Sequence, residues 1–350
     1  MLKDLKVIEL AGVLAGPAAG MFFAELGAEV IKIENSKTGG DITRKWKLPS
    51  EDFNKNTSAY FASVNYNKQH LFLNLHDNTD LQKLYAHIRT ADVLISNWKK
   101  GDAEKLKVSY EIIKEINPQI IYAQITGYGD HSPRVAYDVV LQAETGWMFM
   151  NGTKESGPVK IPVAVIDLFA AHQLKEGILI ALLNRTKTNK GAKVTVSLFD
   201  AAIASLANQA SNFLMENYIP QRSGSLHPNI APYGEIMHTK DGKQIILAVG
   251  TDKQFEVLCD LLQLHNLVED VNYKTNLQRL MHRSNLAKML QEKILMFNAD
   301  DLLTIFQEKN IAAGLIRSME ELFQLDEAKE LILEDEIGSR VRSAIFKIES

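Results

Sequence analysis

The feature that most constrains the fold is a regular alternation of short Val- and Ile-rich runs with helical segments, from the N-terminus past the middle of the chain. Apolar runs of this length are typical of strands that are buried on both faces, and strands joined by helices run parallel. The alternation therefore predicts an α/β domain with an open, mainly parallel sheet covered by helices on both faces. The predicted strands begin near Lys6, Val30, Leu71, Asp92, Gln119 and Lys193, and a long helix is expected over 168–183.

The rest of the chain has a different pattern, which predicts a second and smaller domain. A helix over 201–218 is expected to link the two parts, and helices with a period near 3.6 fill residues 252–308. We therefore expect a Rossmann-like large domain over 1–221, a smaller α+β domain over 222–310, and a return to the large domain over 311–350.

Composition argues against several classes of protein. The formal net charge of −4 gives no basis for an electrostatic search for nucleic acid. A single cysteine, Cys259, excludes an internal disulfide and fits a reducing compartment. No stretch approaches the roughly 20 apolar residues of a membrane span, and the N-terminus lacks the apolar core of a signal peptide. We expect a cytoplasmic protein without a nucleic-acid or membrane partner.

The motifs of the common α/β enzyme classes are absent from the sequence. Gly12, Gly16 and Gly20 recur at every fourth residue, which does not match the dinucleotide fingerprint G-x-G-x-x-G. No Walker A sequence, no Cys/His cluster with zinc spacing and no G-x-S-x-G elbow occurs. We therefore expect neither a metal site nor a tightly bound cofactor.

Asp167 is the candidate functional residue that the local sequence singles out. It is the only acid between Pro158 and Lys175, and it stands where an apolar extended run meets a long helix. Apolar surroundings make an ionised carboxylate costly but more nucleophilic, and a helix N-terminus can hold the charge. An isolated aspartate in this position is most often a helix N-cap, so spacing alone favours a structural role.

Distinctive segments that occur in one order along the chain change this interpretation. They are Val13–Pro17, Leu26–Glu34, Gly40–Arg44, Asn65–Lys68, Ala91–Asn97, Asn117–Tyr122, Ile125–Gly129, Tyr137–Ala143, Ala231–Gly234 followed by Asp241-Gly242, and Ala313–Leu322. From about residue 2 to 345, the chain resembles the class III CoA-transferase family (CaiB/BaiF-like), typified by formyl-CoA transferase and the carnitine CoA-transferases.

The resemblance implies a CoA-transferase that moves CoA from an acyl-CoA to a carboxylic acid, with Asp167 as its nucleophile. In that chemistry the carboxylate attacks the thioester, which gives a mixed anhydride and then an aspartyl-CoA thioester. Such intermediates hydrolyse readily, so the site must exclude water. CoA is then a substrate rather than a resident cofactor. The capping and nucleophilic roles of Asp167 are expected to coexist.

The resemblance also implies where CoA lies on the large domain. The turn after the first strand has small side chains that permit close approach of a ligand. Asn35 stands where formyl-CoA transferase has an arginine, so Lys37 or Arg44 is a candidate substitute for gripping phosphate. For Lys68 and Lys105, the alternative to CoA binding is that they are ordinary surface lysines. The CoA-binding residues implied are Leu14, Ala15, Asn65, Tyr66, Asn67, Lys68, Asn97, Trp98 and Lys105.

Tyr137 and Asp138 match a tyrosine–acid pair that supports the nucleophile in the family. A second acid beside Asp167 could raise its pKa, and the alternative is a structural hydrogen-bonding pair at the start of a helix. The α-methylacyl-CoA racemases share the fold but carry a histidine at this position, and the nearest histidine here is His131. A racemase-type isomerase and a catalytically silent CoA-binding homologue therefore remain the alternatives.

Three further expectations come with the resemblance. The family forms interlocked homodimers, with the active site between the large domain of one subunit and the small domain of the other. The loop 222–230 matches an active-site lid. Relatives commonly continue past the point where this chain stops at Ser350, so the edge of the large domain needs another cover. The acyl pocket, for which Trp147, Met148 and Met150 are candidates, leaves the donor and acceptor acids open.

Overall fold

The computed structural model describes residues 1–349 and divides into two compact units. The first comprises Met1–Phe149, Val159–Ile219 and the chain from Lys329 onward, and the second comprises Met150–Pro158 and Pro220–Ala328. The return to the first unit was expected near residue 311. It comes at Lys329 instead, because the strand β9 (Ala312–Leu315) pairs with a strand of the second unit.

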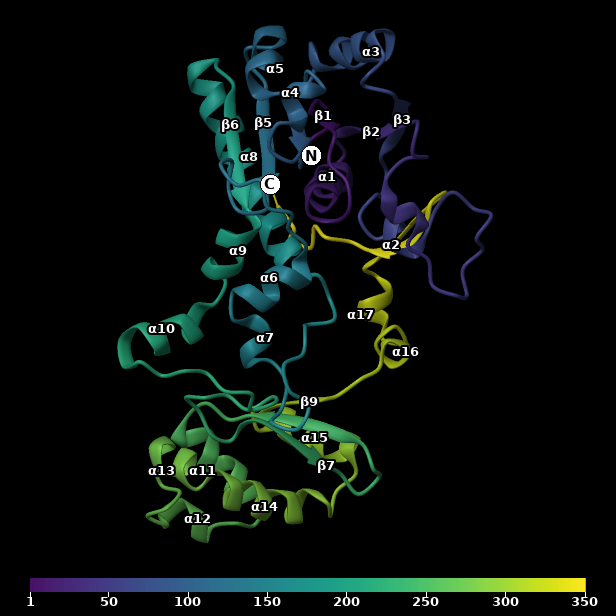
Figure 1. Cartoon of the computed structure of the whole chain (residues 1–350). Coiled ribbons are helices and arrows are strands. Elements are labelled where there is room, and N and C mark those ends of the chain that lie inside the picture. The colour runs from purple at the N-terminus through teal and green to yellow at the C-terminus, as the bar shows by residue number, and fades with distance from the viewer. Residues whose placement is uncertain (350) are drawn as a thin grey trace. The chain divides into compact units, whose positions relative to one another are not determined.

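A six-stranded, entirely parallel sheet forms the centre of the first unit (Figure 1). Its order is β3-β2-β1-β4-β5-β6, so the strand order reverses between β1 and β4. In open α/β sheets, ligands bind beyond the carboxyl ends of the strands at such a reversal. The sheet confirms the predicted α/β class. The strands are β1 (Lys6–Glu9), β2 (Glu29–Asn35), β3 (Gln69–Leu73), β4 (Val93–Ser96), β5 (Ile121–Thr126) and β6 (Ala192–Ser197).

Helices cover both faces of this sheet (Figure 1). Val7 of β1 joins a core with α1 and α8, whereas the next residue, Ile8, joins a core with α3 and α5. Neighbouring strand residues point to opposite faces, so a strand covered on both sides is apolar throughout. The helices of this unit are α1 (Ala15–Glu25), the 3-10 turn η1 (Ile42–Lys45), α2 (Ala59–Ala62), α3 (Asn78–Ile88), α4 (Asp102–Lys105), α5 (Tyr110–Ile116), α6 (Asp138–Glu144), α7 (Trp147–Met150), α8 (Val165–Thr188), α9 (Leu198–Ala204) and α10 (Ala207–Glu216).

The single helix expected over 201–218 is two helices, α9 and α10, in the structure. Ala207, the first residue of α10, adopts φ 47°, in the left-handed region that interrupts a continuous α-helix. The chain that returns to the first unit forms a hairpin of β10 (Ile332–Asp335) and β11 (Gly338–Val341). Beyond the hairpin, the backbone N–H groups of Ser343 and Ala344 donate to the Glu25 carboxylate at the end of α1.

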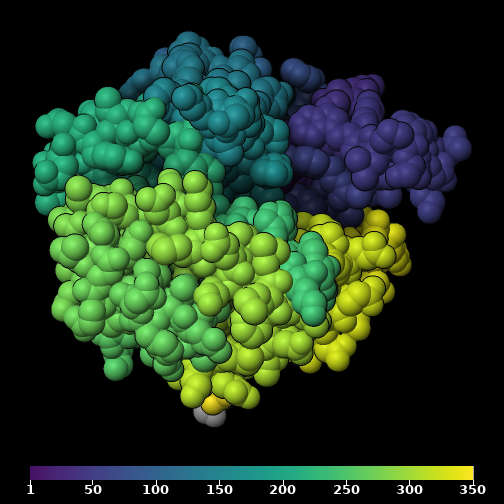
Figure 2. Space-filling view, turned by 90° about the horizontal axis from the view of Figure 1, so that it is seen from below, coloured from purple at the N-terminus to yellow at the C-terminus, as the bar shows by residue number. Residues whose placement is uncertain are grey.

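The second unit has an antiparallel three-stranded sheet and a core of its own. Cys259 is buried in that core, and burial raises the pKa of its thiol to about 12. No helix in residues 1–349 is long and apolar enough to cross a bilayer. In the space-filling view of Figure 2, most atoms of this unit appear in shades of green. Its elements are β7 (Tyr233–His238), β8 (Gln244–Ala248), β9, α11 (Asp252–Leu261), α12 (Asn266–Glu269), α13 (Asn276–Met281), α14 (Arg283–Ile294), α15 (Ala299–Glu308) and α16 (Met319–Leu322), with α17 (Asp326–Lys329) at the boundary.

Candidate active site

A cavity of about 220 Å³ lies where the chain leaves β1, β4 and β5 at the carboxyl edge of the sheet. Asp167, from the first turn of α8, lines it. The reversal of strand order therefore coincides with the cavity that contains the candidate nucleophile. The other lining residues come from Gly12–Ala15, Asn97–Lys100, Gln124–Gly127, Gly129, Asp130, Ser132–Tyr137 and Leu198.

The Asp167 carboxylate is buried but has no polar partner among residues 1–349, since Asp167 is 8% exposed and accepts no hydrogen bond there. The helix cap is a different aspartate, because the Ile166 N–H donates to Asp138 Oδ2 at 2.7 Å. The expected double role of Asp167 therefore divides between two residues. Asp138 caps α8 and leaves Asp167 directed at the cavity.

Burial, with the charge of Asp138 as a second cause, raises the pKa of Asp167 from 3.8 to about 7. A substantial fraction of the carboxylate is therefore ionised at neutral pH, in surroundings that solvate it poorly. The folded protein holds this proton more tightly than the unfolded chain does. Asp167 therefore disfavours folding increasingly as the pH rises from about 4 to about 7, and keeps doing so above that range.

Tyr137 lines the cavity, whereas Asp138 lies behind it as the first residue of α6. Besides capping Ile166, Asp138 accepts a hydrogen bond from Gln142 Nε2 at 2.5 Å. One oxygen of its carboxylate thus holds the N-terminus of α8, and the other bonds Gln142 of α6. Asp138 therefore has a structural role, because it bonds the first turn of the helix that carries Asp167. Its charge also raises the pKa of Asp167.

Replacing Asp138 with asparagine is expected to lower the pKa of Asp167, because it removes the neighbouring negative charge. The acidic limb of the pH–rate profile should then move to lower pH by less than about one unit. The profile of kcat/KM measures the shift. Asp80→Asn, on α3 across the sheet, is the charge-matched control and should leave the limb unchanged. A shift of the acidic limb to higher pH in Asp138→Asn would contradict the conclusion that the Asp138 charge raises the pKa of Asp167.

The turn that contributes Leu14 and Ala15 to the cavity has an unusual backbone. Val13 adopts φ 69°, which a β-branched residue tolerates only with strain of about 1–3 kcal/mol. Asn97 holds Gly12, the residue before Val13, through two hydrogen bonds. The Gly12 N–H donates to Asn97 Oδ1 at 3.1 Å, and Asn97 Nδ2 donates to the Gly12 carbonyl at 2.8 Å. The Asn97 amide is thus committed to the turn. Trp98 also lines the cavity.

A second cavity of about 390 Å³ adjoins the first, since Gly12, Val13 and Asn97–Lys99 line both. Its other side includes Asn35, where the resemblance raised the question of a phosphate grip. Lys99, which the sequence analysis did not select, lines both cavities. Arg44 points elsewhere and forms a bidentate pair with Glu34, with N–O distances of 2.6 and 2.7 Å.

The remaining predicted CoA-binding residues lie outside the Asp167 cavity. The Lys68 ammonium is fully buried and contacts Glu9 Oε2, Asn65 Oδ1 and the carbonyls of Pro17 and Val64 at 2.7 to 3.0 Å. Lys105 is exposed and pairs with Asp102. The structure thus brings together Leu14, Ala15, Asn97, Trp98, Tyr137 and Asp167, and does not bring Asn65, Tyr66, Asn67, Lys68 and Lys105 to that cavity.

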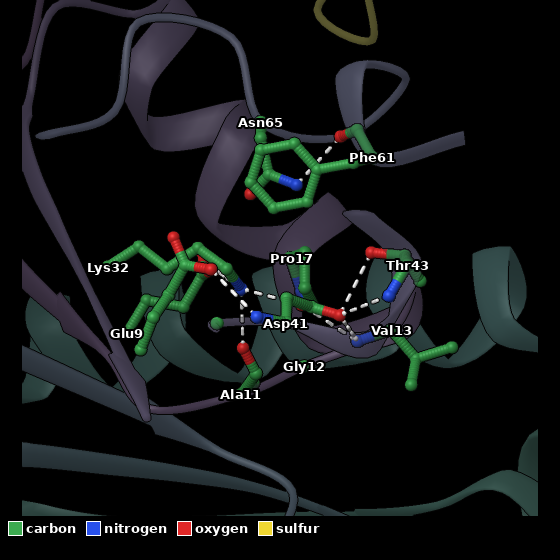
Figure 3. A network of polar contacts seen from close by, with 12 residues as sticks. Glu9, Ala11, Gly12, Val13, Pro17, Lys32, Asp41, Thr43, Phe61 and Asn65 are labelled. Carbon is green, nitrogen blue, oxygen red and sulfur yellow. Dashed lines mark hydrogen bonds and ion pairs between the residues drawn. The ribbon is translucent and has the colours of Figure 1, made fainter. Parts of the chain in front are cut away.

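Lys68 belongs to a buried ion cluster with Glu9, Lys32 and Asp41. Figure 3 labels the other three members, Glu9, Lys32 and Asp41. Lys32 Nζ lies 2.9 Å from Glu9 and 3.1 Å from Asp41, and the four side chains are at most 2% exposed. Burial alone would raise the pKa of Glu9, but the two ammonium groups hold it below its usual range. Two positive and two negative charges compensate one another here.

Sequence reasoning also missed Tyr60 of α2. Burial, together with the charges of Asp167, Asp138 and Asp41, raises its pKa to about 12. The hydroxyl therefore stays protonated at neutral pH. A tyrosine within an apolar run gives no sequence signal for this, since the charges that act on it come from distant segments.

Known proteins match this chain over most of its length. A sequence model described as CoA-transferase family III matches residues 2–341. The succinate–glutarate CoA-transferase of Agrobacterium fabrum is 38% identical over 92% of this chain and 81% of the relative, and the succinyl-CoA:glutarate CoA-transferase of Homo sapiens is 35% identical over 92% and 73%. A crystal structure of a CaiB/BaiF family protein from Brucella suis aligns with TM-score 0.83 at 35% identity, over 98% of this chain and 91% of that one.

Proposed function

Since this chain belongs to CoA-transferase family III and is a transferase of CoA groups, we propose that it works through covalent intermediates on Asp167. One observation carries the proposal. A carboxylate that is 8% exposed, with a pKa of about 7 and no polar partner in residues 1–349, lines the cavity at the reversal of strand order. A carboxylate without partners is free to attack, and its desolvation raises its nucleophilicity.

The reaction balances without an external energy source, because a thioester and a carboxylate exchange for another such pair. An Asp167 oxygen attacks the thioester carbonyl, the C–S bond breaks, and CoA leaves as the thiolate. The thiolate then attacks the Asp167 carbonyl carbon of the mixed anhydride and expels the donor acid. The resulting aspartyl-CoA thioester is attacked by the acceptor carboxylate, and the two steps run in reverse to release the new acyl-CoA.

We propose short dicarboxylic acids and their CoA thioesters as the substrate class. Relatives named for succinate and glutarate transfer support this class. The Asp167 cavity also presents Lys99 and Lys100, whose positive charges can pair with a distal carboxylate, whereas Arg134 of the same lining is paired with Glu144. The CoA moiety is proposed to lie along Leu14 and Ala15, and the assembly is proposed to be a homodimer.

An isomerase is disfavoured by the side chains around Asp167. The second acid–base group that the resemblance implies for a racemase is a histidine, and no histidine lines the cavity among the residues that the structure describes. His131 lies in the adjoining loop, where its carbonyl accepts a hydrogen bond from Lys100 Nζ at 3.2 Å. The lining therefore supports acyl transfer over racemisation.

Incubation with succinyl-CoA and glutarate tests the proposed function. The expected result is equimolar glutaryl-CoA and succinate, detected by mass spectrometry. A run in D₂O with a chiral α-methylacyl-CoA distinguishes the isomerase, which would exchange the α-proton. Binding of CoA without either reaction would identify a silent homologue. A panel of acyl-CoA donors against mono- and dicarboxylic acceptors then defines the substrate class.

A further inference from the structure

The turn between β1 and α1 is held by side chains from other strands and loops (Figure 3). Val13 N–H donates to Asp41 Oδ2 at 3.1 Å, and Gly12 is held through both its N–H and its carbonyl by Asn97. Val13 keeps φ 69°, a conformation that a β-branched residue leaves readily when nothing holds it. The turn therefore depends on contacts from outside its own segment.

Asp41 is itself fixed by a complete set of donors. Its Oδ1 accepts from the Thr43 N–H at 3.0 Å and the Thr43 hydroxyl at 2.9 Å, while Oδ2 faces Lys32 Nζ at 3.1 Å and the Val13 N–H. Lys32 also donates to the Ala11 carbonyl at 2.7 Å, immediately before the turn. The Asp41 side chain is 2% exposed, so no water competes for these contacts.

We propose that Asp41 is a positioning residue for CoA transfer, which holds Val13 in its left-handed conformation and thereby sets Leu14 and Ala15 against the cavity of Asp167. Asp41 does not line the Asp167 cavity, although it lines the adjoining one, and its carboxylate contacts the turn through the Val13 N–H. The inference rests on the proposed function for its effect on the rate. Its effect on the turn is independent of any activity.

Asp41→Asn tests this role, and Thr43→Val is the matched control. The amide removes the negative charge that Lys32 Nζ and the Val13 N–H contact, so even an amide oxygen at the Oδ2 position is a weaker acceptor for Val13. Thr43→Val removes a buried hydrogen bond to the same carboxylate but leaves the Val13 and Lys32 contacts intact. The two variants therefore perturb the same side chain, but only Asp41→Asn weakens the acceptor that holds the Val13 N–H.

Hydrogen–deuterium exchange of the full-length protein is the first measurement. In Asp41→Asn, the amides of residues 12–14 are expected to exchange at least about tenfold faster, while those of β5 keep their native rates. Thr43→Val should leave the turn protected. Unchanged exchange at residues 12–14 in Asp41→Asn would overturn the inference. This measurement needs no turnover, so it tests the inference even if the native protein is inactive. Inactivity of the native protein would refute the proposed function but not the role of Asp41 in holding the turn.

Rescue by glycine is the second measurement. We expect kcat/KM for the acyl-CoA to fall about tenfold or more in Asp41→Asn and to stay within about twofold in Thr43→Val. Glycine adopts φ 69° without strain, so Val13→Gly combined with Asp41→Asn should recover most of the loss. Equal losses in the two single variants, or no recovery in the double variant, would refute the positioning role.

Val13→Gly alone keeps the inference testable should Asp41→Asn not fold. The strain at Val13 predicts that this variant melts no lower than the native protein, although glycine normally destabilises by increasing the entropy of the unfolded chain. A melting temperature several degrees lower would show that Val13 is not strained, and so would leave Asp41 with nothing to hold.

Discussion

Replacing Asp167 with asparagine is expected to lower the rate of CoA transfer by at least about 10³-fold, since the loss of a covalent nucleophile removes the whole reaction path. An amide can form neither the mixed anhydride nor the aspartyl thioester. Tyr137 and Asp138 cannot substitute, because Asp138 is committed to the Ile166 N–H and Gln142. Initial rates of acyl-CoA formation at saturating donor and acceptor measure the loss.

Stability separates this loss from unfolding. Burial raises the pKa of Asp167 to about 7, so at pH 8 the native protein carries a buried and uncompensated charge that opposes folding. The neutral amide lacks that charge, and Asp167→Asn should therefore melt at the native temperature or above it at pH 8. At pH 4, where the native carboxyl group is protonated, the two should differ less. More than about a tenth of the native rate in a folded variant would contradict the nucleophilic role.

Replacing Lys32 with methionine is expected to lower the free energy of unfolding of the first unit by about 3–5 kcal/mol, the usual cost of breaking a buried ion pair by removing one partner. The substitution keeps the apolar stem, but it leaves buried Glu9 with Lys68 as its one remaining ion-pair partner among the described residues and leaves Asp41 with only the Thr43 and Val13 donors. It also leaves the Ala11 carbonyl without its donor. The surrounding structure cannot relax easily, because Glu9 and Lys32 lie opposite each other on the paired strands β1 and β2.

Lys83→Met is the matched control, because Lys83 pairs with Asp80 at 2.9 Å on the exposed face of α3. An exposed pair of this kind contributes less than about 1 kcal/mol. Urea unfolding followed by tryptophan fluorescence reports on the first unit alone, since Trp46, Trp98 and Trp147 all lie in it. Similar unfolding midpoints for the two variants would contradict the cluster's stabilising role.

The sheet was predictable from the sequence because strands covered on both faces must be apolar at every position, as Val7 and Ile8 illustrate. The expected helix over 201–218 was wrong at Ala207, where a left-handed residue interrupts a stretch whose composition favours helix. Local propensity cannot detect such a break, because surrounding structure and not residue type imposes it.

The site was predictable in part. Asp167 was identifiable because a lone acid in an apolar run is unusual, and the order of the matched segments supplied the chemistry. That order locates a segment but does not reveal its exposure, so it could not distinguish Lys68 in the buried cluster from a lysine at the surface. The contact between Asp41 and Val13 joins residues 28 positions apart. It could not be predicted, because every residue except proline has a backbone N–H and the sequence does not indicate which side chain will accept from it.

Hydroxylamine trapping tests the central claim most directly. Native protein is incubated with acyl-CoA and hydroxylamine, digested, and the modified peptide is sequenced by mass spectrometry. Attack on the aspartyl carbonyl expels CoA and leaves a stable hydroxamate, so the account predicts a single hydroxamate at Asp167 that depends on acyl-CoA. Turnover of acyl-CoA to a new thioester with no hydroxamate, or with the hydroxamate on another residue, would contradict it.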